Sequence, residues 1–138
     1  MYKNILVTVA YEAEHDATPS LEIAKALADP DARLTLMHVM EPAPVFALNY
    51  MPEGWQEDLR RAIEADLGRL AGPLGQDVSI VVTEGDPAHE VLEHARAQRV
   101  DCIVVASHRP GTQSLLLGST ASKIVGRAQC SVHVARRK

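Results

Sequence analysis

Residues 102–134 read CIVVASHRPGTQSLLLGSTASKIVGRAQCSVHV, and this stretch decides the fold. It starts with a short apolar run at 102–106, rich in β-branched residues, which predicts a buried strand. After a loop comes one apolar helical stripe, made of Ala121, Ile124, Val125 and Ala128. Val132 and Val134 then mark a further strand. A strand, a helix and a second strand in this order predict a crossover unit of a parallel sheet.

The same alternation of strand and helix fills the chain upstream of this stretch. Strand-like runs lie at 5–9, 34–39 and 78–83. The helical stripes that follow them comprise Leu21, Ala24 and Ala28 widened by Ile23 and Leu27, then Leu59, Ile63, Leu67 and Leu70, and then Ala88, Val91, Leu92 and Ala95. The whole chain therefore reads as strand and helix in strict alternation, beginning and ending with a strand.

Local signals set the expected helix ends. Thr18 and Asp86 are each followed by proline, which predicts an N-cap with proline in the first turn. Gly72-Pro73 predicts the end of the second helix. The proline-rich stretch 41–54 predicts a long loop. Three aromatic side chains in or beside this loop are expected to be available for packing, namely Phe46, Tyr50 and Trp55.

This pattern predicts an α/β fold. We expect one domain over residues 1–138, with a single doubly wound, Rossmann-like sheet of five mainly parallel strands and four helices on both faces. Aromatic residues make up only 4% of the chain, so the core must come from Val, Ile, Leu and Ala, which suits a parallel sheet. Ligands of such folds bind beyond the carboxyl ends of the strands, where the strand order reverses.

Composition excludes several classes of partner. A formal net charge of −4 disfavours nucleic acid, whose binding depends on Lys and Arg. No apolar run approaches the roughly 20 residues of a membrane span. Cys102 and Cys130 lie in or beside apolar runs, as core residues of a reducing compartment do. Because Met1 leads directly into a strand, we expect a cytoplasmic protein. The histidines and cysteines lack zinc spacing, so no metal site is expected.

The loop before the last helix, residues 107–120, carries the chemistry. Gly118 lets an anion approach the backbone of the helix N-terminus, and Ser119 and Thr120 add hydroxyl donors. His108 and Arg109 supply further donors for a phosphate. The alternative is an ordinary turn and N-cap. The segment matches neither a Walker loop nor a G-x-G-x-x-G fingerprint.

These residues resemble the universal stress protein family, in its small bacterial single-domain form. The resemblance runs from the first strand to the last, and its motifs are Gly85-Asp86-Pro87, the SHRP…LLGS loop and Cys130–Val134. It implies an adenine nucleotide alpha hydrolase-like fold. Nucleotide-binding members carry G-x2-G-x9-G-[S/T] here. Ala106 stands at the first glycine, Arg109 and Gly111 share the second, Gly118-Ser119 match the final pair, and the loop is one residue shorter.

The resemblance also implies roles for single residues. Gly118, Ser119 and Thr120 would hold the phosphates, and the backbone at Val39 would meet adenine. Ala10 follows the first strand, where family members commonly have an Asp that contacts the base or ribose. A lost charged hydrogen bond is worth about 1.5–3 kcal/mol, roughly ten- to a hundredfold in affinity. Nucleotide binding is therefore expected to be weakened without being abolished.

The function expected from these residues is binding of ATP or another adenine nucleotide, with any Mg²⁺ carried by the phosphates. The resemblance implies a homodimer through the last strand, at Val132, His133 and Val134, that reports stress or energy state. One alternative keeps the fold and acts only through an unknown protein partner. Bulky side chains from Tyr11 or from the loop 41–54 that occupy the cleft would favour it. Another is a slow ATPase or autophosphorylating protein, against which stands the absence of a P-loop lysine. We expect no catalytic residues.

Overall fold

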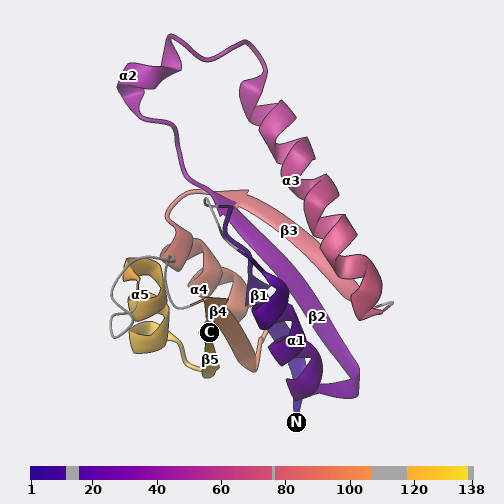
Figure 1. Ribbon diagram of the computed structural model, residues 1–138. Coiled ribbons are helices and arrows are strands. Elements are labelled where there is room, and N and C mark those ends of the chain that lie inside the picture. Colours follow the sequence, from indigo (N-terminus) through magenta and orange to yellow (C-terminus); the bar gives the residue numbers. More distant parts are fainter. Residues whose placement is uncertain (12–15, 76, 107–117, 137–138) are drawn as a thin grey trace.

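The computed structural model of the chain describes residues 1–11, 16–75, 77–106 and 118–136 (Figure 1). Its strands are β1 (Tyr2–Thr8), β2 (Ala28–Met40), β3 (Val78–Glu84), β4 (Cys102–Ala106) and β5 (Ser131–Ala135). Its helices are α1 (Thr18–Leu27), α2 (Val45–Leu48), α3 (Trp55–Ala71), α4 (Pro87–Ala97) and α5 (Ser119–Arg127), with a turn of 3-10 helix, η1 (Gly72–Leu74), after α3.

The strands form one parallel sheet in the order β3-β2-β1-β4-β5. The predicted doubly wound α/β fold is thereby confirmed. The chain builds β2 and β3 on one side of β1 and then returns to add β4 and β5 on the other. The strand order thus reverses between β1 and β4, where α/β sheets leave a crevice for ligands.

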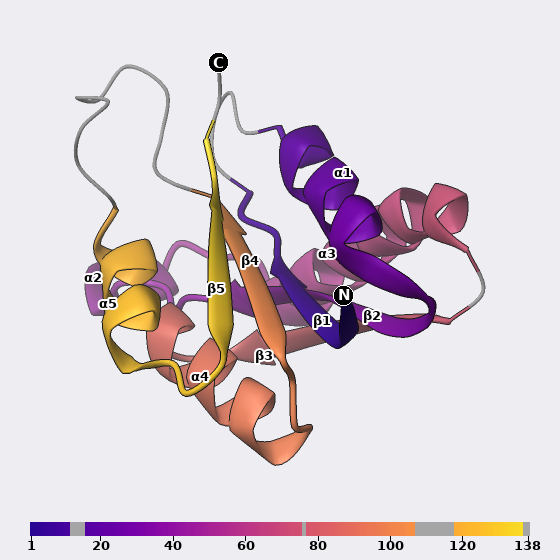
Figure 2. The same ribbon diagram turned by 90° about the horizontal axis from the view of Figure 1, so that it is seen from below.

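Helices cover both faces of the sheet (Figure 2). On one face α1 and α3 pack against alternate residues of the central strands, including Ile5, Val7 and Leu36. On the other face α4 and α5 pack against Leu6 and Ile103. The two faces alternate along β1 because successive side chains of a strand point in opposite directions. Both helical layers are therefore fixed by the apolar runs of the same few strands.

The centre of the sheet is tied together across the length of the chain. The Asp101 carboxylate accepts hydrogen bonds from the backbone N–H groups of Lys3 and Asn4, at 2.9 and 3.0 Å. The Asp101 N–H in turn donates to the Asn4 carbonyl at 2.9 Å. These bonds set the start of β4 against the start of β1.

Two predicted helix boundaries need correction. Thr18 is the first residue of α1 rather than its N-cap, which is Ala17, and the Thr18 N–H donates to Asp16 Oδ1 at 3.0 Å. Ala28 does not belong to the helical face, because α1 ends at Leu27 and β2 begins at Ala28. By contrast Asp86 caps α4 as predicted, since its Oδ2 accepts from the His89 N–H at 3.0 Å.

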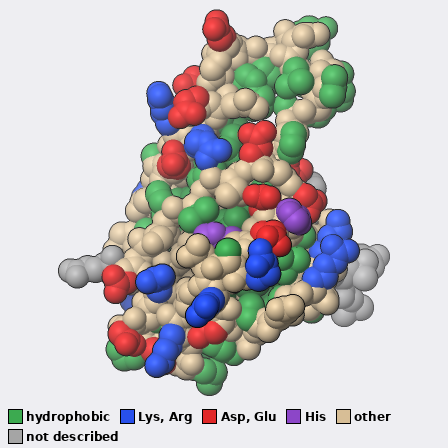
Figure 3. Space-filling view, turned by 180° about the vertical axis from the view of Figure 1, so that it is seen from behind, with side chains coloured by type: hydrophobic (Ala, Val, Ile, Leu, Met, Phe, Trp, Pro, Cys, Tyr) green, Lys and Arg blue, Asp and Glu red, His purple; other side chains and the backbone are tan. Residues whose placement is uncertain are grey.

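The segment 41–54 also differs from its prediction. It contains the single turn α2 where a loop was expected, so the described residues form one α-helix more than the four predicted. Phe46 and Tyr50 are 80% and 87% exposed, so they do not pack as expected. The segment stands away from the sheet, and hydrophobic side chains gather on it (Figures 1 and 3). Proline at 42 and 44 ends β2 and directs the chain outward.

Three smaller observations complete the fold. Val125 was predicted on the buried stripe of α5 but is 45% exposed, so the stripe is narrower than its spacing suggested. Cys102 is buried, and Cys130 is half-buried against the α4 and α5 side. Across the described ranges, no helix has the length and apolar character needed to cross a membrane.

Candidate functional site

The topology brings several predicted residues to one edge of the sheet. Ala10 follows β1, Val39 lies near the end of β2, and Ala106 is the last residue of β4. Gly118 is the N-cap of α5, the helix that follows β4. Carboxyl ends of parallel strands meet at one edge, so these positions surround the β1–β4 crevice. The predicted residues His108, Arg109 and Gly111 lie outside the described residues.

The N-terminus of α5 has the features of an anion site. Gly118 is in an extended conformation, and its carbonyl accepts the first helical hydrogen bond, from the Ser122 N–H at 2.9 Å. Ser119 and Thr120 are exposed, and their N–H groups precede that first bond. The first turn carries no acidic residue, and Arg127 occupies the last turn. The positive end of the helix dipole is therefore not neutralised from within the helix.

On the β2 side the backbone of Val39 faces the end of β1. The Val9 N–H donates to the Met37 carbonyl at 2.8 Å, so Met37 turns its backbone groups toward β1. Alternate residues of a strand turn the same way, which gives Val39 the same direction. β1 ends at Thr8, which pairs with Met37, so Val39 lies beyond the last paired residue of β1. The N–H and C=O of Val39 therefore point toward the space beyond the C-terminal end of β1.

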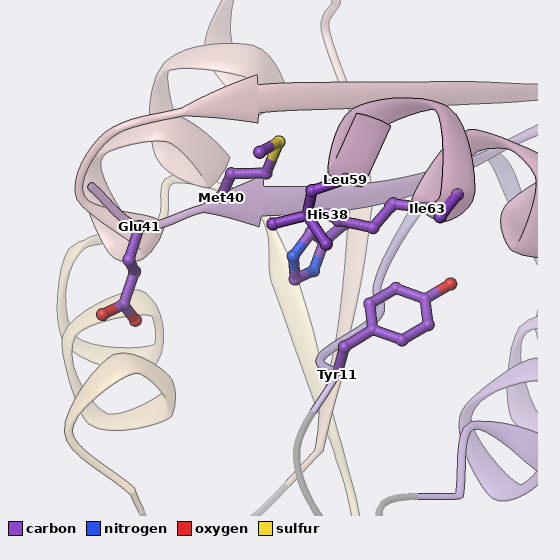
Figure 4. A pocket seen from close by; sticks show the side chains of 7 residues that line it. Tyr11, His38, Met40, Glu41, Leu59 and Ile63 are labelled. Carbon is purple, nitrogen blue, oxygen red and sulfur yellow. The ribbon is translucent and has the colours of Figure 1, made fainter. Parts of the chain in front are cut away.

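A cavity of about 320 Å³ opens near this end of β2 and is lined there by His38 and Met40, the two neighbours of Val39 in sequence. Its lining comes from the chain after β1, from the end of β2 and from the first half of α3 (Figure 4). The residues are Tyr11, His38, Met40, Glu41, Leu59, Ala62 and Ile63. Sequence reasoning placed none of them in a site, apart from naming Tyr11 as a side chain able to fill the cleft. His38 shares one face of β2 with Leu34, Leu36 and Met40. This alternation is the sequence signal that could have placed its side chain on that face.

Tyr11 is anchored at the wall of this cavity. Its hydroxyl donates to Asp66 Oδ2 at 2.6 Å, and Asp66 Oδ1 accepts from Nε and Nη2 of Arg69 at 3.0 and 2.8 Å. Burial, followed by the hydrogen bond to Asp66, raises the pKa of Tyr11 above its ordinary value. The bond from Tyr11, followed by that from Arg69, lowers the pKa of Asp66. Tyr11 is thus a neutral phenol that ties the end of β1 to α3.

His38 stands on the sheet beneath Tyr11. The two rings meet edge to face, with centroids 4.9 Å apart and planes at 80°. His38 Nδ1 lies 2.7 Å from the Val9 carbonyl oxygen. These contacts fix both rings while leaving the cavity open, so Tyr11 borders the cleft without filling it. The segment 41–54 contributes only Glu41 to the lining.

Titratable groups elsewhere in the described part of the chain do not gather into a metal centre. Within the described ranges, no three His, Cys, Asp or Glu side chains lie close enough to hold an ion. Asp86, which lies two residues after Glu84, is engaged as the cap of α4.

Comparison with known proteins identifies the fold. The model of the Universal stress protein family matches residues 1–136. The chain belongs to the universal stress protein family. A universal stress protein of Thermus aquaticus, from the QAH/OAS sulfhydrylase 3′ region, is 33% identical over 145 residues, covering 99% of this chain and the whole of that relative. Universal stress protein A homolog 2 of Coxiella burnetii is 34% identical over 143 residues, covering 99% of this chain and 97% of the relative.

Solved structures share the architecture. The hypothetical protein MJ0577 superposes with a TM-score of 0.82 at 22% identity, covering all of this chain and 98% of that one. An Arabidopsis thaliana universal stress family protein with AMP bound gives 0.68 at 18% identity, covering 99% and 92%. A universal stress protein in complex with cAMP gives 0.72 at 18% identity, covering 98% and 97%. At these identities the likeness establishes the shared fold.

Proposed function

We propose that this universal stress protein binds an adenine nucleotide, ATP above all, across the carboxyl edge of its sheet. The observation that carries the proposal is the pairing of two sites on that edge. The cavity beside β1 and β2 is apolar and open, as a base requires. The N-terminus of α5 offers N–H groups and hydroxyls to phosphates. In the strand order β1 separates β2 from β4, so a nucleotide would cross the end of β1.

The base side fits adenine through its backbone. Adenine presents a ring-nitrogen acceptor next to an exocyclic amine donor. The N–H and C=O of Val39 face the open end of β1 and have the complementary polarity. Met40, Leu59 and Ile63 supply apolar surface to the ring. A mostly apolar lining with a few placed polar groups is the usual composition of a small-molecule site.

The phosphate side fits an anion through Gly118, Ser119 and Thr120. By the family pattern Ala106, Arg109 and Gly111 stand at the glycine positions of the phosphate loop, and the side chains of His108 and Arg109 would supply further donors to the same phosphates. Any Mg²⁺ would arrive bound to the phosphates of the nucleotide, because the sequence shows no cluster of carboxylates near the loop. The structural relatives that carry AMP and cAMP support an adenine nucleotide as the class of ligand.

The proposal also covers the oligomeric state of the protein and its role in the cell. β5 is an edge strand of the sheet, and His133 is exposed on it between the half-buried Val132 and Val134. An unpaired edge favours pairing with a second copy, so we infer a homodimer through β5. A dimer that binds ATP in the cytoplasm would report stress or energy state to a protein partner. Sedimentation velocity tests the dimer, and a monomer at 100 micromolar protein would refute it.

Release and titration of nucleotide test the binding function. The purified protein is denatured and the released ligand is analysed by chromatography, and apo protein is titrated with ATP by calorimetry. Gly118→Glu, which sets a carboxylate at the helix N-terminus, is expected to abolish binding. Gly126→Glu, in the same helix but away from its N-terminus, is the matched control. If wild-type protein neither carries nor binds nucleotide, the partner-only alternative gains, and Ala10 is the residue that favours it.

An enzymatic role is the remaining alternative. Phosphoryl transfer requires groups that position and neutralise the transferring phosphate. Lys123, which lies within α5, is not beside Gly118 as a P-loop lysine would be. We therefore propose binding without turnover. ATP hydrolysis that persists in Gly118→Glu would come from a contaminant.

A further inference from the structure

We propose that His38 is a specificity-determining residue of the cavity, whose Nε2 accepts a hydrogen bond from the exocyclic amine of a bound base. The inference rests on the proposed function and deepens it. It makes a side chain, in addition to the strand backbone, responsible for preferring a 6-amino purine over a 6-oxo purine.

The position of Nδ1 determines the tautomer of His38. Nδ1 lies 2.7 Å from the carbonyl oxygen of Val9. A carbonyl oxygen can only accept, so the hydrogen of this bond belongs to Nδ1. A neutral imidazole carries one N–H, and Nε2 is then a bare acceptor. The backbone of the chain just after β1 thereby sets which hydrogen-bonding group His38 offers.

The acceptor is open to the cavity. His38 is half-buried and lines the cavity wall together with Met40, two residues further along β2 on the same face (Figure 4). Within the described part of the chain Nε2 has no hydrogen-bond partner, and it is not a buried unpaired atom. An acceptor that is neither paired nor sealed off is reached by solvent, and a ligand in the cavity would replace that solvent.

The other lining side chains provide no competing donor. Met40, Leu59, Ala62 and Ile63 are apolar. The Tyr11 hydroxyl is committed to Asp66 at 2.6 Å, and Glu41 at the rim offers a carboxylate, which accepts. The polar side-chain atoms left for a ligand are therefore acceptors. The amine of a 6-amino base donates a hydrogen bond to His38 Nε2. A 6-oxo base instead places a carbonyl oxygen opposite the lone pair of Nε2, and both acceptors are left without a donor.

Paired titrations with ATP and ITP test this inference, because the two nucleotides differ only at the 6-position of the base and the adjacent ring nitrogen. Wild-type protein is expected to prefer ATP by about tenfold, the effect of one hydrogen bond with a penalty for unpaired acceptors. His38→Phe is expected to reduce this ratio severalfold, leaving only the preference due to the backbone of Val39. His38→Gln, which retains an acceptor, should keep part of the preference. Leu59→Ala, in the same wall, is the matched control and should weaken both nucleotides alike.

The outcomes separate the two proposals. Equal affinity for ATP and ITP in wild-type protein, or a wild-type ratio in His38→Phe, overturns the role of His38 and leaves nucleotide binding standing. Failure of wild-type protein to bind either nucleotide overturns both. If His38→Phe does not fold, the triphosphate of purine riboside replaces the variant. It lacks the amine and adds no oxo group, and it is titrated against wild type and His38→Gln. A loss of affinity relative to ATP that is larger in wild type than in His38→Gln supports the inference, and equal losses in the two proteins refute it.

Discussion

Removing one oxygen atom from Tyr11 tests the link between the end of β1 and α3. In the Tyr11→Phe variant the ring and its edge contact with His38 remain, while the hydrogen bond to Asp66 at 2.6 Å is lost. A hydrogen bond to a charged group contributes about 1.5–3 kcal/mol in a shielded place. Tyr11 is 42% exposed and Asp66 keeps its bonds to Arg69, so solvent screening reduces this value. We expect a loss of about 1 kcal/mol at pH 7.

The pH dependence of that loss follows from the two pKa shifts. The folded-state pKa of Asp66 is depressed, so its contribution is present above the ordinary value of 3.8 and disappears as the pH falls through the folded value. The folded-state pKa of Tyr11 is raised, so its contribution is present below the ordinary value of 10.0 and disappears as the pH rises beyond it. The difference between wild type and Tyr11→Phe should therefore be largest between about pH 5 and 9.

Urea unfolding across this pH range measures the difference. Tyr50→Phe is the matched control, because it removes the same atom from a side chain that is 87% exposed. It should leave the free energy of unfolding unchanged. A Tyr11→Phe variant as stable as the control at pH 7, or a loss that does not shrink at pH 3, would show that the bond to Asp66 does not stabilise the fold.

Further predictions concern the cap, the core and the ligand site. Asp86→Ala removes the cap of α4 and should lower the free energy of unfolding by about 1 kcal/mol, measured in urea. Leu67→Ala, at a fully buried site, should cost about 2–5 kcal/mol, whereas Leu59→Ala at a 44% exposed site should cost far less; equal losses would contradict the assigned faces of α3. Ala10→Asp restores the family's acceptor and should tighten ATP binding roughly ten- to a hundredfold by calorimetry. Unchanged affinity would remove position 10 from the site.

Sequence patterns predicted the fold where the rule involved is local. Asp86 was identified as a cap because capping needs only the next three residues. The first half of β2 was missed because residues 28–33 include acidic residues and a proline, and Ala28 continued a helical spacing. Here β2 pairs irregularly with β1, with a register shift between Tyr2 and Asn4. Irregular pairing leaves no periodic signature, so only the tertiary structure reveals it.

The candidate site also has one part that local sequence predicts and one part that it does not. Gly118 and its neighbours could be predicted because a helix N-terminus is specified by adjacent residues. The cavity could not, since it joins Tyr11 after β1 to His38 on β2 and Leu59 on α3. On the helix, Leu59 carries the same apolar spacing as the buried Leu67, and nothing in the sequence distinguishes a core position from a cavity wall. That distinction depends on how far α3 stands from the sheet.

The central place of β1 has a consequence for how the protein is made. β1 leaves the ribosome well before β4, yet Asn4 meets its partner Asp101, which lies 97 positions further along the chain. Until β4 has been synthesised, one side of this central strand has no neighbour. A growing chain of β1, β2 and β3 therefore exposes an apolar edge, and non-local pairing of this kind is slow to form. We expect truncation before residue 102 to yield aggregating fragments, because the strand that completes the middle of the sheet is among the last to appear.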